Sequence, residues 1–273
     1  MSLIDIGTIH SSKEILDIAF RRANKEARGL RSGLRQPPVK KAIIIELERI
    51  TNAGHTIENE LTAIGESYPS FNHLHPFYED LTKLTLDLDS VKRSIGAVSW
   101  ASKKVRSLTM DARQRIRRSK SVESIIHHRK AFFGRASSIV LQITKNLEAL
   151  DDARRIVKKY PSIKTDMPTV AIAGFPNAGK STLLTTMTGA SPKIAPYPFT
   201  TQRIMLGYAD NIQFIDTPGL LDRPVKNLVE RHALNALKHL SHLNVFLIDP
   251  TSSCGFPFED QLNLKNDLEE HYP

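Results

Sequence analysis

Residues 170–181 read Val-Ala-Ile-Ala-Gly-Phe-Pro-Asn-Ala-Gly-Lys-Ser, so an apolar run passes directly into the pattern G-x-x-x-x-G-K-S. Gly174 and Gly179 let the backbone turn tightly and aim its N–H groups at phosphate oxygens. A helix beginning near Lys180 adds the positive end of its dipole. The Lys180 ammonium reaches the β- and γ-phosphates, and the Ser181 hydroxyl ligates Mg²⁺. The stretch predicts a strand, a phosphate-binding loop and a helix, with nucleotide contacts from Gly174, Phe175, Pro176, Asn177, Ala178, Gly179, Lys180, Ser181 and Thr182.

Two further segments follow at distances that suit the same site. Residues 214–219 read as a strand that delivers Asp216 and Gly219 into a loop. There Asp216 can hold Mg²⁺ through a water, and the Gly219 N–H can sense the γ-phosphate. Between the two motifs, the proline-rich segment 196–201 disfavours helix and strand, and a threonine within it can complete the metal shell. Three elements in this order predict a nucleotide switch domain.

The two parts of the chain differ in periodicity. From residue 169 onward, short apolar runs alternate with helical stretches, which favours a largely parallel α/β sheet covered by helices, with strands at 170–173, 204–208, 212–215 and 245–248. Residues 1–160 show apolar stripes at spacings of three and four, typical of four or five helices in an antiparallel bundle, two of them long. Residues 161–168 read as a linker. The predicted fold class is therefore α plus α/β, a helical bundle followed by a P-loop domain.

Charge is divided in the same way. The 273 residues carry a net charge of +9, made up of +11 over residues 1–166 and −2 over residues 167–273. Between Lys92 and Lys120 there are ten basic residues and one acid, Asp111. Like charges on one helix repel unless a polyanion meets them, so this region is a candidate RNA contact. The alternative is an ordinary solvated helix face. The candidate RNA-binding residues are Lys103, Lys104, Arg106, Arg113, Arg115, Arg117, Arg118 and Lys120.

Composition excludes several classes of protein. A single cysteine, Cys254, rules out an internal disulfide and a zinc site built from cysteines. No apolar stretch approaches the length of a membrane span, and the first residues lack the pattern of a signal peptide. We expect no membrane partner, no DNA and no particular oligomer. Trp100, Phe132 and Phe133 are expected to lie in the core.

Several of these motifs resemble a known family. GFPNAGKS, YPFTT and DTPG in this order resemble the Obg group of GTPases. The resemblance narrows to the nucleolar GTP-binding protein family through residues 75–81 (HPFYEDL), 128–135, 216–224 (DTPGLLDRP) and 254–261 (CGFPFEDQ). It implies a helical domain docked on a GTPase domain, with GTP or GDP and Mg²⁺ as cofactors. The implied partner is the precursor of the large ribosomal subunit, with its rRNA and ribosomal proteins. The location would be the nucleolus in a eukaryote and the cytoplasm in an archaeon.

The resemblance also assigns residue roles by position. It makes Thr201 the switch threonine that ligates Mg²⁺, with Thr200 as the alternative. The second switch would be Asp216, Thr217, Pro218 and Gly219. Lys180, Thr201 and Gly219 are then the candidate catalytic residues.

The sequence departs from the GTPase pattern in two places. Leu220 follows Gly219, where Ras-like enzymes place the glutamine that orients the attacking water, so hydrolysis should be slow. The guanine-selecting N-K-x-D motif is absent, since Lys265-Asn266-Asp267 has the wrong order and falls in an expected helix. We therefore expect the GTPase domain to be incomplete at its C-terminal end. Asn177 stands where related GTPases use an asparagine to help hold K⁺, although it can equally stabilise the turn of the loop.

The sequence is compatible with three functions. The first is a switch GTPase with slow hydrolysis that acts in assembly of the large ribosomal subunit. The second is a nucleotide-bound assembly scaffold that hardly turns over. The third is an ATPase, since some Obg-like relatives have altered base selection.

Overall fold

The computed structural model describes residues 6–189, 191–196, 203–216 and 238–271. Contacts group the chain into two compact units: residues 1–68 with 87–154, called the helical unit here, and residues 69–86 with 155–273, called the sheet unit. The sequence predicts a helical domain over residues 1–160, a linker over 161–168 and a second domain from residue 169. The grouping by contacts differs from this, because residues 69–86 belong with the strands. No helix within the described residues combines the length and the apolar character that crossing a bilayer requires.

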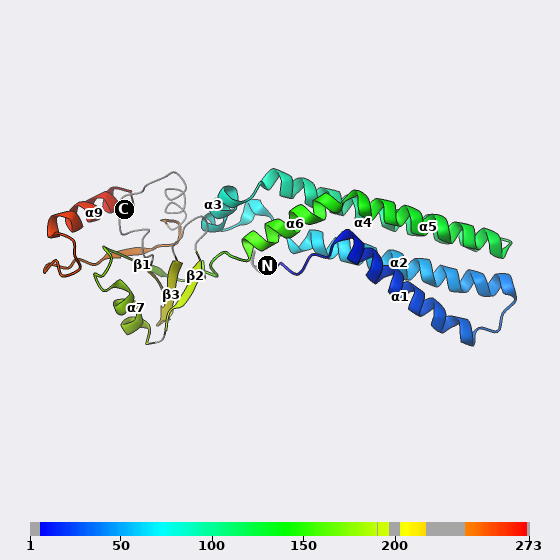
Figure 1. The fold of residues 1–273 in the computed structure, drawn as a ribbon, viewed down its shortest axis with the longest axis horizontal. Helices are drawn as coiled ribbons and strands as arrows, with labels where there is room; N and C mark the ends of the chain where they lie inside the picture. Colours follow the sequence, from blue (N-terminus) through cyan, green and yellow to red (C-terminus); the bar gives the residue numbers. More distant parts are fainter. Residues whose placement is uncertain (1–5, 190, 197–202, 217–237, 272–273) are drawn as a thin grey trace. The chain divides into compact units, whose positions relative to one another are not determined.

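Long helices packed side by side make up the helical unit (Figure 1). The first four of these helices begin at a recognisable signal. Ser11 forms a capping box with Glu14, Asp87 and Ser121 accept hydrogen bonds from backbone N–H groups, and Pro38 occupies a first helical position. The helices are α1 (Ser12–Gly33), α2 (Pro38–Ser67), α4 (Leu88–Arg118), α5 (Val122–Gln142) and α6 (Thr144–Val157).

Apolar stripes meet along the length of this unit, and α2 packs against both α1 and α4. Buried residues recur at intervals of three and four, as in the fully buried Ile50, Ala53, Ile57 and Leu61 of α2. At Gly54, an added Cβ would lie 2.1 Å from Oγ1 of Thr109, so the absence of a side chain here lets α2 and α4 approach closely. The predicted helical bundle is confirmed.

The sheet unit has the strand order β2-β3-β4-β1-β5. β1 pairs in parallel with β4 and β5, whereas β3 is antiparallel to β2 and β4. The sheet is therefore mixed: β3 runs opposite to the other four strands of this sheet, which share one direction. The predicted α/β fold of this part of the chain is confirmed. The elements are β1 (Thr169–Ala173), α7 (Lys180–Thr188), β2 (Lys193–Pro196), β3 (Arg203–Ala209), β4 (Ile212–Asp216), β5 (Leu243–Phe246) and α9 (Phe258–His271).

A tight turn explains the antiparallel pairing. Asp210 and Asn211 have φ angles of 47° and 63° and join Ala209 directly to its partner Ile212. Aspartate and asparagine tolerate this left-handed backbone, which two-residue hairpin loops require. Expected strands at 170–173, 204–208 and 212–215 match β1, β3 and β4. The fourth lies at 243–246 rather than 245–248, and β2 was not expected.

Helix α3 (Pro76–Thr85), which follows the short 3₁₀ turn η2 (Phe71–His73), belongs to the sheet unit. The Tyr78 hydroxyl donates to the carbonyl oxygen of Pro161 at 2.9 Å and accepts from the backbone N–H of Ile163 at 3.1 Å. The Tyr160 hydroxyl contacts that of Thr85, and burial raises the pKa of Tyr160 to about 12. Residues 160–163, expected to be the end of one domain and the start of a linker, are thus held against α3.

Candidate nucleotide-binding site

The phosphate-binding loop connects β1 to α7, and its backbone conformation depends on two glycines. Gly174 has φ 138° and Gly179 has φ 93°, values that L-residues with side chains rarely adopt. A Cβ on Gly174 would also lie 2.6 Å from the carbonyl oxygen of Leu247, so the loop is pressed against the segment that follows β5. Asn177 is left-handed as well, with φ 63°. This supports a turn-stabilising role for Asn177, since asparagine adopts that conformation readily.

Lys180, the first residue of α7, folds back over this loop. Its side chain is buried, and Nζ donates to the carbonyl oxygens of Gly174 and Phe175 at 2.8 Å each. The ammonium therefore lies inside the turn of the loop, at the N-terminal end of a helix. A positive charge and the end of a helix dipole at one point favour an anion there.

Ser181 and Asp216 meet beside the loop. Ser181 Oγ donates to Asp216 Oδ2 at 2.8 Å, and Asp216 is fully buried. The contact follows from the sheet, because β1 pairs with β4 in the register Ile172 with Asp216, which brings the end of β4 next to the start of α7. A hydroxyl and a carboxylate offer the hard oxygen ligands that Mg²⁺ prefers, so this pair fits the metal.

Not every candidate residue can be placed. Phe175 is buried, Pro176 and Thr182 are exposed, and Ala178 lies in the loop, half-buried. The candidates that lie outside the described residues are Thr200, Thr201, Thr217, Pro218, Gly219 and Leu220. The structure thus assembles the loop, Lys180, Ser181 and Asp216, while the roles of these residues in binding nucleotide remain predictions.

A polar network that sequence reasoning missed lies directly behind the loop. Gln261, fully buried in α9, donates to the carbonyl oxygens of Asp249 and Phe256 at 3.0 Å each and accepts from the Asp249 N–H at 2.7 Å. Hydrogen bonds from the Thr251 and Ser253 hydroxyls and from the Cys254 N–H hold the pKa of Asp249 well below its usual value.

This network reaches the phosphate loop through an aromatic pair. The ring centroids of Phe175 and Phe256 are 4.3 Å apart. The motif at 254–261 is visible in the sequence as part of the family resemblance. Its contact with the loop is not, because it depends on how residues 249–261 fold back on themselves.

The candidate RNA-binding residues lie on α4 and just after it. Lys103, Lys104, Arg106, Arg115, Arg117, Arg118 and Lys120 are exposed, and Arg113 is half-buried. Two of them have acidic partners: Arg106 lies 3.6 Å from Glu58, and Arg115 lies 3.0 Å from Asp111. The expectation for Trp100 is wrong, since 44% of this residue is exposed, whereas Phe132 is buried in the core.

A strand, a glycine-bounded phosphate loop, a lysine at the start of a helix and a serine–aspartate pair define the class of P-loop nucleotide-binding domains. Comparison with family models agrees. Residues 5–164 match the NOG1 N-terminal helical domain, and residues 169–272 match the 50S ribosome-binding GTPase model. The chain belongs to the nucleolar GTP-binding protein family and carries its helical domain and a GTPase domain.

Individual relatives support this assignment. An uncharacterized protein of Methanocaldococcus jannaschii is 37% identical over 96% of this chain and 75% of its own length. Nucleolar GTP-binding protein 1 of Encephalitozoon cuniculi is 29% identical over 93% of this chain and 49% of its own. The Saccharomyces cerevisiae protein of the same name is 28% identical over 97% and 41%. The chain thus spans half or less of these two eukaryotic relatives.

Proposed function

We propose that this chain acts as a GTP-binding switch with slow hydrolysis in the assembly of the large ribosomal subunit. The observation that carries the proposal is the convergence of Lys180, Ser181 and Asp216 at one loop, in a chain with the GTPase domain of this family. The association with the ribosome is supported by the description of the matched family, a 50S ribosome-binding GTPase.

The chain's own residues have separable tasks in this proposal. The loop N–H groups and Lys180 bind the phosphates and orient them. Ser181 would hold Mg²⁺ directly, and Asp216 would hold it through a water. Mg²⁺ held by these two residues would neutralise negative charge on the bound phosphates. Thr201 and Gly219 complete the proposal as the residues that respond to the γ-phosphate.

Slow hydrolysis is proposed because Leu220 has no polar group with which to orient the attacking water. Multiple-turnover GTP hydrolysis, measured with and without large ribosomal subunits, tests both parts. We expect slow turnover that the particles accelerate. Turnover that stays undetectable under both conditions would instead favour the nucleotide-bound scaffold. Competition between GTP and ATP for binding separates the GTPase from an ATPase of the Obg-like group.

Asn177 gives the proposal one further element, a K⁺ ion near the phosphates that neutralises charge in the transition state. Asn177 is an exposed residue of the phosphate loop, and an amide oxygen is a suitable ligand for a cation. We expect faster single-turnover hydrolysis in K⁺ than in Na⁺. Equal rates in the two salts would leave Asn177 with the turn-stabilising role alone.

The helical unit is proposed to dock on ribosomal RNA through the basic face of α4. Support comes from the charge of this region and from the exposure of its arginines and lysines. Replacing Arg113, Arg117 and Arg118 with glutamate should weaken binding to ribosomal subunits and lower its dependence on salt. The proposed location is the nucleolus for a eukaryotic source and the cytoplasm for an archaeal one.

A further inference from the structure

A groove runs between α2 and α4 on the surface of the helical unit. One hollow, of about 220 Å³, is lined by His55, Glu58, Asn59, Arg106, Thr109, Met110 and Arg113. A second hollow, of about 440 Å³, continues along the same two helices and shares Glu58 and Arg106 with the first. The ion pair between these two residues therefore stands where the hollows meet.

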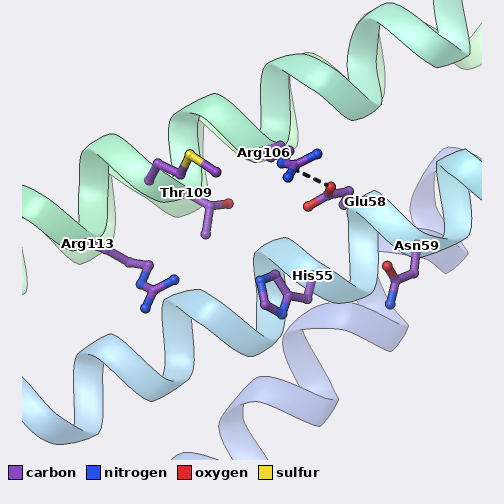
Figure 2. A pocket seen from close by; sticks show the side chains of 7 residues that line it. His55, Glu58, Asn59, Arg106, Thr109 and Arg113 are labelled. Atoms are coloured by element: carbon purple, nitrogen blue, oxygen red, sulfur yellow. Dashed lines mark ion pairs between the residues drawn. The ribbon is translucent and has the colours of Figure 1, made fainter.

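The lining of the first hollow is polar on both sides (Figure 2). His55, Glu58 and Asn59 come from α2, and Arg106, Thr109 and Arg113 come from α4. In Figure 2, His55 and Arg113 enter the same space from the two opposite helices. Met110 adds an apolar surface that is 57% exposed. Cations, an amide group and one apolar side chain together offer contacts for a phosphate, a ribose and the face of a base.

The basic residues of α4 fall into two groups on its exposed side. At about 100° per residue, Lys103, Arg106, Arg113 and Arg117 lie within about 80° of one another, along the edge that faces α2. Lys104, Arg115 and Arg118 lie along the opposite edge. Among the described residues, no carboxylate lies within ion-pair distance of Lys103, Arg113 or Arg117. The edge of α4 that borders the groove thus carries a line of positive side chains, whose charge the acidic partners among the described residues neutralise only in part.

Glu58 distinguishes between possible occupants. A carboxylate in a basic groove repels a phosphate, but it accepts hydrogen bonds from hydroxyl and amino groups. Its partner Arg106 is 64% exposed at the side chain and 3.6 Å away, so water screens the pair and a phosphate can replace Glu58 as the partner of Arg106 at little cost. Glu58 and Asn59 are then free to contact the 2′-hydroxyl, the group by which proteins tell RNA from DNA.

We propose that the groove between α2 and α4 binds a single-stranded or splayed segment of RNA, with phosphates at Arg106 and Arg113 and a ribose hydroxyl at Glu58 and Asn59. This inference rests on the proposed RNA-docking role of the helical unit and names the site and the contacts within it. Arginine suits the two phosphate positions because its guanidinium can make two parallel hydrogen bonds to one phosphate.

Two double variants of the full chain test the location. The groove variant, R106Q with R113Q, removes one ion-paired and one unpaired arginine. The matched control, R115Q with R118Q, does the same on the opposite edge of the same helix. Binding is measured by fluorescence anisotropy with a labelled single-stranded RNA of mixed sequence, about 12 nucleotides long, between about 50 and 200 mM salt. Circular dichroism confirms that both variants keep their helices.

We expect the groove variant to bind this RNA at least about 10-fold more weakly, and its salt dependence to fall by about 1.4 in logarithmic slope, as losing two phosphate contacts predicts. The control should also lose affinity, because Arg118 belongs to the proposed docking face, but by a clearly smaller factor than the groove variant. Equal losses in the two variants would overturn the groove but leave RNA docking by α4 intact. If the unaltered chain binds neither this RNA nor ribosomal subunits, the result would contradict the proposed RNA-docking role itself, and the groove assignment with it.

Two further experiments test the contact made by Asn59 and the preference of the groove for RNA over DNA. N59A removes no charge and lies on an exposed position of α2, so weaker RNA binding in this variant would place the contact in the groove itself. A DNA of the same sequence should bind more weakly than the RNA, and E58Q should narrow this difference. Equal affinity for RNA and DNA, or competition by polyglutamate as effective as that by RNA, would overturn the assignment to RNA.

Discussion

The ring centroids of Phe256 and Phe175 lie 4.3 Å apart, and the planes of the two rings meet at an angle of 34°. Phe175 belongs to the phosphate loop, and Phe256 belongs to a segment that Gln261 holds in place through hydrogen bonds to Asp249 and Phe256. The segment after β5 therefore supports the loop from behind. A loop whose N–H groups must stay aimed at phosphate oxygens benefits from such support, because pre-organisation lowers the cost of binding.

Replacing Phe256 with alanine is expected to weaken nucleotide binding without touching the nucleotide. The aromatic pair is worth about 0.5–1.5 kcal/mol beyond its buried area, so the Kd for a fluorescent GDP should rise about 3- to 10-fold. F258A is the matched control, since Phe258 lies two residues away and is 42% exposed. F256Y, which keeps the ring, should restore affinity. An unchanged Kd in F256A would show that the loop holds its conformation alone.

Ser181 should control the response of nucleotide binding to magnesium. S181A removes the hydroxyl that donates to Asp216, and with it the proposed direct ligand of the metal. We expect the gain in GDP affinity that Mg²⁺ gives over EDTA to fall by about 10- to 100-fold. The control is T186A, because Thr186 is exposed and its hydroxyl donates within α7, to the carbonyl oxygen of Thr182. An S181A protein that keeps the full magnesium effect would place the metal elsewhere.

The close approach of α2 and α4 makes Gly54 sensitive to substitution. In G54A the new methyl would meet Thr109 Oγ1 at 2.1 Å and Cγ2 at 2.8 Å, so one helix must shift. Overpacking of this kind destabilises by about 1–3 kcal/mol, measured as the free energy of unfolding in urea. T109A removes both clashing atoms, and the double variant should therefore recover part of the loss. Additive effects in the double variant would contradict direct contact as the cause.

Much of the nucleotide site could be predicted from the sequence because its constraints are local. Only glycine adopts the backbone of positions 174 and 179 without strain. Lys180 and Ser181 follow directly, so the side chain of one lies inside the loop and that of the other lies beside Asp216. The pairing of Ser181 with Asp216 also follows, once β1 and β4 are placed side by side in parallel.

The remaining features depend on contacts between distant residues. Nothing near Gln261 in the sequence indicates burial, because its partners at 249 and 256 reach it only in the folded segment. Helix α3 belongs to the sheet unit because Tyr78 bonds to residues 161 and 163, more than eighty positions later. Trp100, which is expected in the core, falls off the apolar stripe of α4, which passes through Val98, Ala101 and Val105.

Stability of the sheet unit should depend on the protonation of His75. Its ring accepts the N–H of Phe77 at the start of α3, through Nδ1 at 3.3 Å. Burial lowers the pKa of His75, the nearby His239 and His242 lower it further, and Asp166 opposes them. His239 also pairs with Asp80 at 3.2 Å. The folded state therefore binds a proton at His75 less readily than the unfolded state does.

The direction of the pH effect follows from that difference. Stability rises with pH where the unfolded state binds more protons. The contribution of neutral His75 is complete above the unfolded pKa of about 6.5, and it is lost as the pH falls from there toward the lowered folded value.

H75N keeps a side chain that can cap the helix but does not titrate. Between about pH 7.5 and pH 5.5, within the range where histidine titrates, the Tm of the unaltered chain should fall several degrees further than that of H75N. H127N, on an exposed position of α5, should behave like the unaltered chain. Parallel losses of Tm in H75N and the unaltered chain would assign the pH dependence to other groups.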